Sequence, residues 1–161
     1  MFITLKEGTV MIDILKKQGE LLKPETFQKA LTAQLKVTGR LNVPCAMLLM
    51  RIEFEDVYSN SFGGLTELRE AFAGLVSSMV RDTDTIGWLE DGCLAVLLRA
   101  VTAADTTLVA TRLQRQIARR PIMFGARNVY VAVQIGGVWT SGDNPMPIDD
   151  FTEQAWVAML S

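Results

Sequence analysis

The sequence predicts an α+β fold in which helices pack on a mixed β-sheet. Segments with the helical spacing of apolar residues alternate with short apolar or alternating segments typical of strands. Two of the strand segments are separated only by two acids and a glycine, which predicts a hairpin and makes part of the sheet antiparallel. The chain has 161 residues, of which 49% are apolar, and this suits one globular domain with a buried core.

The chain divides into an accessory segment, residues 1–22, and a domain, residues 23–161. Within the accessory segment, the stretch from Val10 to Leu22 has helix-like apolar spacing. A stronger helix begins at Pro24, because proline suits the first turn of a helix, and it ends near Gly39. Its apolar residues follow at helical intervals: Phe27, Leu31 and Leu35.

The next three segments are predicted as strand, loop and helix. Residues 46–54 are apolar at first and then alternate, which predicts a strand whose methionines belong to the core. Residues 56–64 are rich in serine, asparagine and glycine and are predicted as a loop. Residues 65–80 carry an apolar stripe at helical spacing and are predicted as an amphipathic helix.

A polar turn, Arg81 to Asp84, precedes the predicted hairpin. The strands of the hairpin are residues 85–89 and 93–98, and both are short and apolar. The turn between them is Glu90-Asp91-Gly92. Acids followed by glycine between two β-prone runs favour a tight turn.

The last third of the chain predicts helix, strand and helix. Residues 102–117 form an amphipathic helix with arginines toward its end, where cations suit the helix dipole. Residues 129–135 are predicted as a strand, and Gly136 and Gly137 as the loop that follows it. A final helix begins at Asp149 with acids in its first turn. The predicted order is therefore α-β-α-β-β-α-β-α.

Composition excludes several classes of function. The chain has no histidine, which excludes Ser-His-Asp and Cys-His catalysis and histidine metal sites. Its 16 Lys and Arg residues do not exceed its 18 Asp and Glu residues, so we expect no nucleic-acid partner. The two cysteines, Cys45 and Cys93, are expected to be reduced and buried. No apolar run approaches the roughly 18 residues of a membrane span, and the N-terminus lacks a signal-peptide pattern.

The run from Arg81 to Leu98 reads R-x-x-D, five residues, Glu-Asp-Gly-Cys-Leu and a short apolar strand. This order and spacing resemble the centre of the GGDEF domain, whose family comprises diguanylate cyclases and their inactive relatives. Residues 44–50, 131–136 and 154–160 resemble the first strand, a later strand and the closing helix of the same family. The resemblance covers residues 24–160 and implies a mixed, mostly antiparallel sheet of about five strands, with helices on both faces.

The five-residue signature departs from that of an active cyclase. Glu90 and Asp91 stand where two glycines let the family's backbone approach GTP. Gly92 and Cys93 stand where the family has acids that bind metal or act in catalysis, and Leu94 replaces a phenylalanine. The resemblance therefore assigns a degenerate hairpin to this chain.

A further metal-binding aspartate of the family corresponds to Arg51, which could instead pair with Glu53 or Glu55. Phosphoryl transfer depends on phosphates bridged by metal ions, so we expect no catalytic residue, no metal site and no cyclase activity. One alternative is a slipped hairpin that offers Glu90 and Asp91 as the acids. Such a slip would move the strand after it out of register with the core.

The R-x-x-D turn itself is retained as Arg81 and Asp84. In the family this turn binds the product cyclic di-GMP, and a further arginine comes from the helix after the hairpin. Arg112 stands 18 positions after Leu94, where the resemblance places that arginine, and Arg115 lies one turn beyond it. Arginine can donate to guanine O6 and N7, aspartate can accept from guanine N1–H and N2–H, and the two helical arginines can meet the phosphodiesters.

A purely structural interpretation of these four residues is also open. Arg81 follows a helix and could complement the carbonyl end of its dipole, while Asp84 could cap the turn. Arg112 and Arg115 could belong to a solvated helix face.

The sequence therefore predicts a catalytically inactive GGDEF domain that acts as a cyclic di-GMP receptor in the bacterial cytoplasm, alone or within a larger assembly. It would bind through Arg81, Asp84, Arg112 and Arg115, need no cofactor, and relay the signal to a protein partner. The resemblance also implies a ligand-linked homodimer and a role in biofilm formation and exopolysaccharide regulation. The alternatives are a ligand-free interaction scaffold and a residual diguanylate cyclase or GTP binder.

Overall fold

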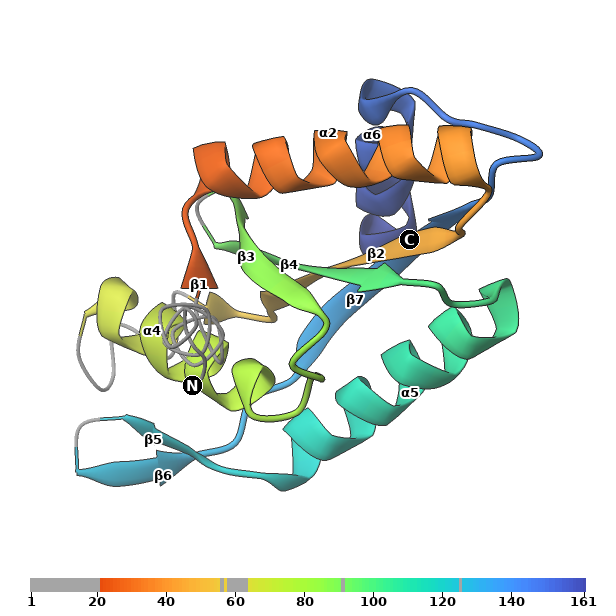
Figure 1. The fold of residues 1–161 in the computed structure, drawn as a ribbon. Coiled ribbons are helices and arrows are strands. Elements are labelled where there is room, and N and C mark those ends of the chain that lie inside the picture. The colour runs from red at the N-terminus through yellow and green to blue at the C-terminus, as the bar shows by residue number, and fades with distance from the viewer. Residues whose placement is uncertain (1–20, 56, 58–63, 91, 125) are drawn as a thin grey trace, which may run out of the picture.

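Five strands form the central sheet in the order β1-β3-β4-β2-β7 (Figure 1). In this computed structural model the described residues are 21–161 except 56, 58–63, 91 and 125. β1 pairs in parallel with β3, and the other neighbours pair antiparallel, which confirms the mixed, mostly antiparallel sheet. The strands are β1 (Leu21–Leu22), β2 (Cys45–Ile52), β3 (Thr85–Glu90), β4 (Cys93–Arg99) and β7 (Val133–Thr140).

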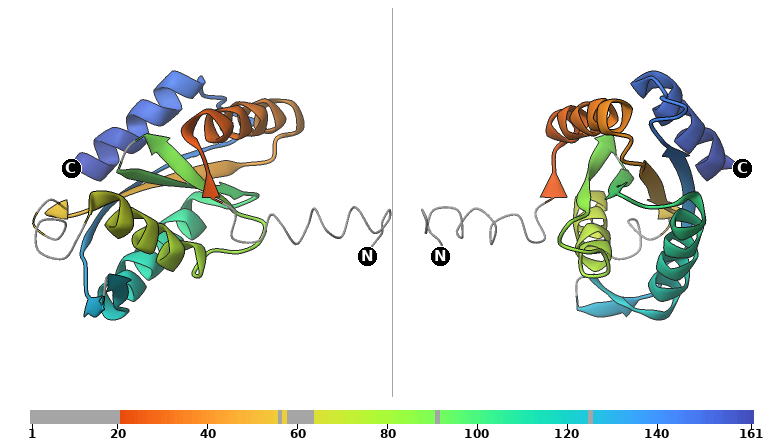
Figure 2. Two further views of the ribbon diagram at one scale, coloured as in Figure 1. Left: turned by 90° about the vertical axis from the view of Figure 1, so that its left-hand side faces the viewer. Right: turned by 45° about the vertical axis from the view of Figure 1, so that its right-hand side comes forward.

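Helices cover both faces of the sheet, as the resemblance implied. α2 (Pro24–Leu41) and α6 (Ile148–Leu160) lie on one face, and α4 (Leu65–Ser77) and α5 (Ala103–Arg119) lie on the other (Figure 2). A small hairpin of β5 (Ile122–Phe124) and β6 (Arg127–Val129) stands apart from the main sheet. None of the described helices is long and apolar enough to cross a membrane.

The sheet separates two apolar cores, and β2 supplies side chains to both. Because successive residues of a strand face opposite sides, Leu48 and Met50 pack with α4 while Met47 and Leu49 pack with α2 and α6. All four of these side chains are fully buried. The methionine-rich strand is therefore core, as its sequence predicted.

The helix ends follow the local signals in the sequence. Pro24 occupies the first turn of α2, and Asn42 ends this helix in the left-handed region with φ 53°. The N–H of Asn42 donates to the carbonyl oxygen of Thr38 at 3.0 Å. Thr102 begins α5 with a capping box, in which its side chain accepts from the Asp105 N–H and the Asp105 carboxylate accepts in return.

Some elements differ from the sequence predictions. Leu21 and Leu22, at the end of the stretch with helix-like spacing, form the strand β1, so the last residues of the accessory segment join the sheet. The strand predicted over residues 46–54 ends at Ile52, because Phe54 adopts a left-handed φ of 55°. The strand predicted over 129–135 is split between β6 and β7, and the separate β5–β6 hairpin was not predicted. The rest of the accessory segment, residues 1–20, lies outside the described residues.

The predicted loop at Gly136 and Gly137 is instead the middle of β7. A Cβ atom on Gly136 would collide with the backbone of Ala158 and Met159 in α6. The glycine therefore allows a helix to pack directly on a strand, which is a role for strand glycines distinct from turn formation.

Candidate functional site

The R-x-x-D turn joins α4 to β3 and is closed by its own backbone and side chains. The N–H of Asp84 donates to the Arg81 carbonyl oxygen at 3.0 Å. In return, the backbone N–H of Arg81 donates to Asp84 Oδ2 at 2.8 Å. These two hydrogen bonds fix the backbone of the turn and therefore the positions of the Arg81 and Asp84 Cα atoms.

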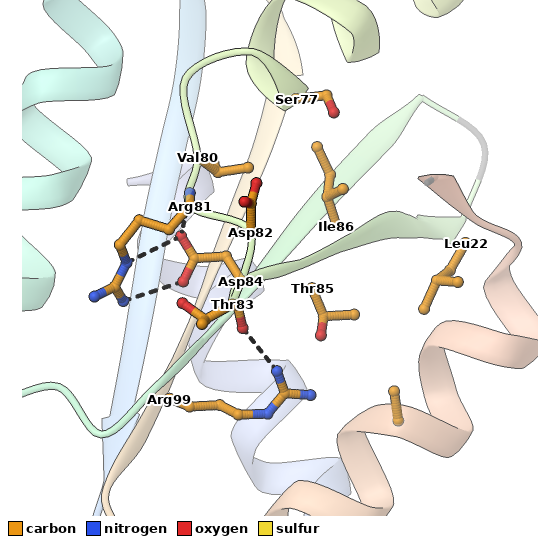
Figure 3. Close-up of a pocket in the computed structure, with 11 residues that line it drawn as sticks. Leu22, Ser77, Val80, Arg81, Asp82, Thr83, Asp84, Thr85, Ile86 and Arg99 are labelled. Carbon is orange, nitrogen blue, oxygen red and sulfur yellow. Dashed lines mark hydrogen bonds and ion pairs between the residues drawn. The ribbon is translucent and has the colours of Figure 1, made fainter. Parts of the chain in front are cut away.

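The side chains of Arg81 and Asp84 also bind each other (Figure 3). Arg81 Nη2 lies 3.1 Å from Asp84 Oδ1, and Arg81 Nε lies 3.5 Å from Oδ2. The Asp84 side chain is 4% exposed, whereas that of Arg81 is 59% exposed. In this conformation Asp84 holds the Arg81 guanidinium, so a ligand that accepts from Arg81 meets an oriented group. A ligand that uses Asp84 as an acceptor must first displace Arg81.

The other two predicted ligand residues, Arg112 and Arg115, project from α5. Both are exposed, and within the described part of the chain neither has an ion-pair partner. Figure 3 shows α5 on the side of the turn to which the Arg81 side chain extends. Arg81 and α5, the helix that carries Arg112 and Arg115, are therefore on the same side of the turn.

A cavity of about 470 Å³ lies on the other side of the same turn. It is bounded by β1, α2, the end of α4 and the start of β3 (Figure 3). Its lining combines apolar and polar side chains: Leu22, Ala30, Ser77, Val80, Arg81, Asp82, Thr83, Asp84, Thr85, Ile86 and Arg99. This volume falls within the range of small-molecule sites.

Arg99 is a site residue that the sequence analysis missed. It ends β4, and its Nη1 donates to the carbonyl oxygen of Thr83 in the turn at 2.8 Å. Its Nε donates to Gln34 Oε1 of α2 at 2.9 Å. Arg99 therefore links the turn to α2. A lone arginine after an apolar strand gives no sequence signal of such a role, because both partners are distant in the chain.

The five-residue signature, residues 90–94, lies at the tip of the β3–β4 hairpin. Trp88 pairs with Leu94 and Glu90 with Cys93, with a register irregularity between Trp88 and Glu90. Residues 94–98 remain buried and in register with β2, so the slipped hairpin is not formed. Gly92 has φ 77°, which explains a glycine at this place. Asp91 lies outside the described residues.

Cys93 is buried in the core beneath the hairpin, with 1% of its surface exposed. Burial raises the pKa of its thiol to about 12, and Glu90 adds to the rise while Arg51 opposes it. The group at this signature position is therefore a neutral thiol near neutral pH.

Arg51 bonds to β7 and not to the glutamates considered from the sequence. Its Nε donates to Gln134 Oε1 at 2.6 Å. Glu55 instead accepts two hydrogen bonds from Arg69 of α4, at 3.0 and 2.9 Å. The region between β2 and the hairpin thus contains two guanidinium groups.

The described residues at the positions that the resemblance assigns to metal ligands do not fit a divalent cation. Magnesium sites use carboxylate and other oxygen ligands, whereas the corresponding positions here are Arg51, Gly92 and a buried thiol. Among the residues that the structure describes, no group of three or more Asp, Glu or Cys side chains could hold a metal ion.

The fold is shared with solved GGDEF domains. The GGDEF domain of FimX from Pseudomonas aeruginosa superposes with a TM-score of 0.79 at 15% identity, over 86% of each chain. The diguanylate cyclase SiaD of the same organism, in complex with its activator SiaC, gives 0.78 at 15% identity, over 94% of this chain and 61% of that chain. The GGDEF domain of DgcB from Caulobacter crescentus, in complex with cyclic di-GMP, gives 0.76 at 10% identity, over 87% and 84%. No protein-family model and no curated protein matches the chain. At these identities the likeness establishes the fold.

Proposed function

We propose that this domain, built on the GGDEF fold, is a catalytically inactive receptor for cyclic di-GMP that passes its signal to a protein partner. The observation that carries the proposal is the closed R-x-x-D turn. Its buried carboxylate orients an exposed guanidinium toward the side on which α5 lies, and α5 carries two further exposed arginines, Arg112 and Arg115.

The charges of this side suit a cyclic dinucleotide. Arg81 can donate two N–H groups to O6 and N7 of a guanine, and its plane can stack on a purine. Arg112 and Arg115 can meet the two phosphodiester charges of the ligand. Asp84 acts by positioning Arg81, and it becomes a direct acceptor for guanine only if the ion pair opens.

Two structural neighbours support the proposal that the domain binds cyclic di-GMP and a protein partner. DgcB was solved with cyclic di-GMP, and SiaD was solved with a protein activator. The same fold in those proteins therefore accommodates both kinds of interaction, which is the combination proposed for this chain.

The proposed inactivity rests on the hairpin region. Catalysis of phosphoryl transfer needs metal ions that bridge the phosphates. Arg51 places a fixed positive charge at the position assigned to a metal ligand, and Cys93 offers a neutral, buried thiol. The signature positions also add Glu90 beside the place of the triphosphate, where negative charge repels it.

Calorimetric titration of the protein with cyclic di-GMP in Mg²⁺-free buffer tests the proposal. We expect micromolar or tighter binding that Arg81→Ala weakens by roughly 10- to 150-fold, because a charged hydrogen-bonding contact is worth about 1.5–3 kcal/mol. Arg40→Ala is the matched control, since Arg40 is an exposed arginine at the far end of α2.

Three outcomes separate the candidate functions. Binding without Mg²⁺ that depends on Arg81 supports the receptor. A folded wild-type protein that binds neither cyclic di-GMP nor GTP favours the ligand-free scaffold and contradicts the receptor. Binding that requires GTP and Mg²⁺ favours a residual nucleotide enzyme.

A further inference from the structure

The cavity beside the R-x-x-D turn is lined in part by Arg81 and Asp84, but the Arg81 guanidinium extends to the other side of the turn (Figure 3). Figure 3 shows the Arg81 guanidinium directed away from Leu22 and Ile86, which form the opposite part of the lining. The cavity is therefore a separate space that shares the turn as a wall. The proposed contacts of Arg81, Arg112 and Arg115 do not account for it.

The apolar part of the lining suits a flat ring. Leu22 of β1, Val80 after α4 and Ile86 of β3 supply branched aliphatic side chains from three different segments, and Ala30 of α2 adds a small one. Ile86 is 4% exposed and so belongs to the rigid core of the sheet. Aliphatic walls held by separate elements can enclose an aromatic ring without rearranging.

The polar part of the lining contains an acid, Asp82, and an arginine, Arg99, at separate places. Figure 3 shows the Asp82 carboxylate in the upper part of the lining, between Val80 and Ile86, and the Arg99 guanidinium in the lower part, below Thr85. Arg99 is held by its bonds to Thr83 and Gln34, which engage Nη1 and Nε. Its Nη2 has no hydrogen-bond partner among the described residues, so a ligand can accept from it. The Thr85 hydroxyl lies in the same lining.

We propose that this cavity binds a guanine base, with Asp82 accepting from the base and Arg99 donating to it. Guanine carries donors at N1 and N2 and acceptors at O6 and N7, so it satisfies a carboxylate and a guanidinium at once. Adenine has no N1–H and presents a donor at N6 beside N7, so it satisfies this pair less well.

The guanine can come from cyclic di-GMP or from a mononucleotide. Assignment to cyclic di-GMP rests on the proposed function, and it extends the ligand contacts from the Arg81 side across the turn. Assignment to a mononucleotide would make the cavity an independent guanine site. The chemistry of recognition is the same in both cases.

The test fills the cavity and leaves the Arg81 side intact. Ala30→Trp places a large side chain in the lining, and Ala33→Trp is the matched control on an exposed position of the same helix. Asp82→Asn removes the carboxylate, with the exposed Asp143→Asn as its control. Each variant of the whole chain is titrated with cyclic di-GMP, GMP and AMP, and its thermal unfolding midpoint is recorded to establish folding.

We expect Ala30→Trp and Asp82→Asn to weaken guanine-nucleotide binding at least tenfold, the two controls to leave it unchanged, and AMP to bind more weakly than GMP. If cyclic di-GMP binds and Ala30→Trp behaves as Ala33→Trp does, the guanine cavity is refuted while the receptor function stands. If GMP binds in a cavity-dependent manner and cyclic di-GMP does not bind, the receptor function fails and the cavity stands. Absence of binding by both nucleotides refutes both proposals.

Discussion

At the scale of single residues, the fold uses charged side chains mainly for orientation. The Arg81–Asp84 ion pair adds at most about 1 kcal/mol to stability, because solvent screens the Arg81 side chain, which is 59% exposed. The geometry matters more, because a carboxylate that is 4% exposed restricts the guanidinium to one place. Arg99 is restricted in the same way by Thr83 and Gln34. Preorganised donors lose less entropy when a ligand binds them.

The buried thiol of Cys93 predicts a pH dependence of stability. Its pKa is about 12 in the folded protein, against an ordinary value of 9.0 for a thiol in an unfolded chain. Because the thiol has a higher pKa in the folded protein than in the unfolded chain, protonation of Cys93 favours the folded state. This contribution to stability is complete below about pH 9 and is lost as the pH rises toward 12. We expect the free energy of unfolding to fall above pH 9 by up to about 1.4 kcal/mol per pH unit.

Urea unfolding of the wild type and of Cys93→Ala across this pH range measures the effect. Burial also raises the pKa of Cys45, and this second thiol is present in both proteins and serves as the internal reference. The variant is expected to lose stability with pH more gradually than the wild type. Equal slopes would contradict the assignment to Cys93.

At the scale of elements, β7 shows how packing decides what a glycine does. Two adjacent glycines between apolar residues favour a loop by local rules. In the fold both lie in a strand, and residue 136 must be a glycine because α6 approaches β7 too closely for a side chain there. The helix that requires this glycine is a separate element further along the chain, so the local pattern did not reveal it.

Substitution of two glycines tests this explanation. Gly136→Ala is expected to destabilise the protein by about 1–3 kcal/mol, the usual cost of overpacking. Gly74 lies in the interior of α4, and a Cβ atom added there would meet no other atom within 4 Å. Gly74→Ala is therefore expected to stabilise the protein by about 0.5–1 kcal/mol. Urea unfolding measures both changes, and a neutral Gly136→Ala would show that α6 can move away from β7 at little cost.

At the scale of the whole molecule, the R-x-x-D turn and the tip of the hairpin lie at opposite ends of the same strand. β3 begins after the R-x-x-D turn and ends at Glu90 of the hairpin. β1 and α2 border the cavity at the turn, and β1 is formed by the last two residues of the accessory segment. A ligand at the turn would therefore touch elements that connect to the start of the chain.

The proposed lack of cyclase activity depends on residues of both β2 and the hairpin. With GTP and Mg²⁺ we expect no cyclic di-GMP from the wild type. Arg51→Asp alone is expected to restore none, because Gly92 and Cys93 still supply no carboxylate. Chromatographic analysis of the reaction mixture measures the product, with an active diguanylate cyclase assayed in parallel. Product formed by the wild type would overturn the proposed inactivity.

The sequence by itself determined the fold class, most of the helices and strands, and the closed turn between Arg81 and Asp84. These features depend on periodicity, capping and short-range hydrogen bonds, which neighbouring residues specify. Only the tertiary structure decided the pairing of β1, the strand glycines of β7, the partner of Arg51 and the link from Arg99 to the turn. Each of those depends on groups that are distant in sequence and meet only when the sheet and its helices pack together.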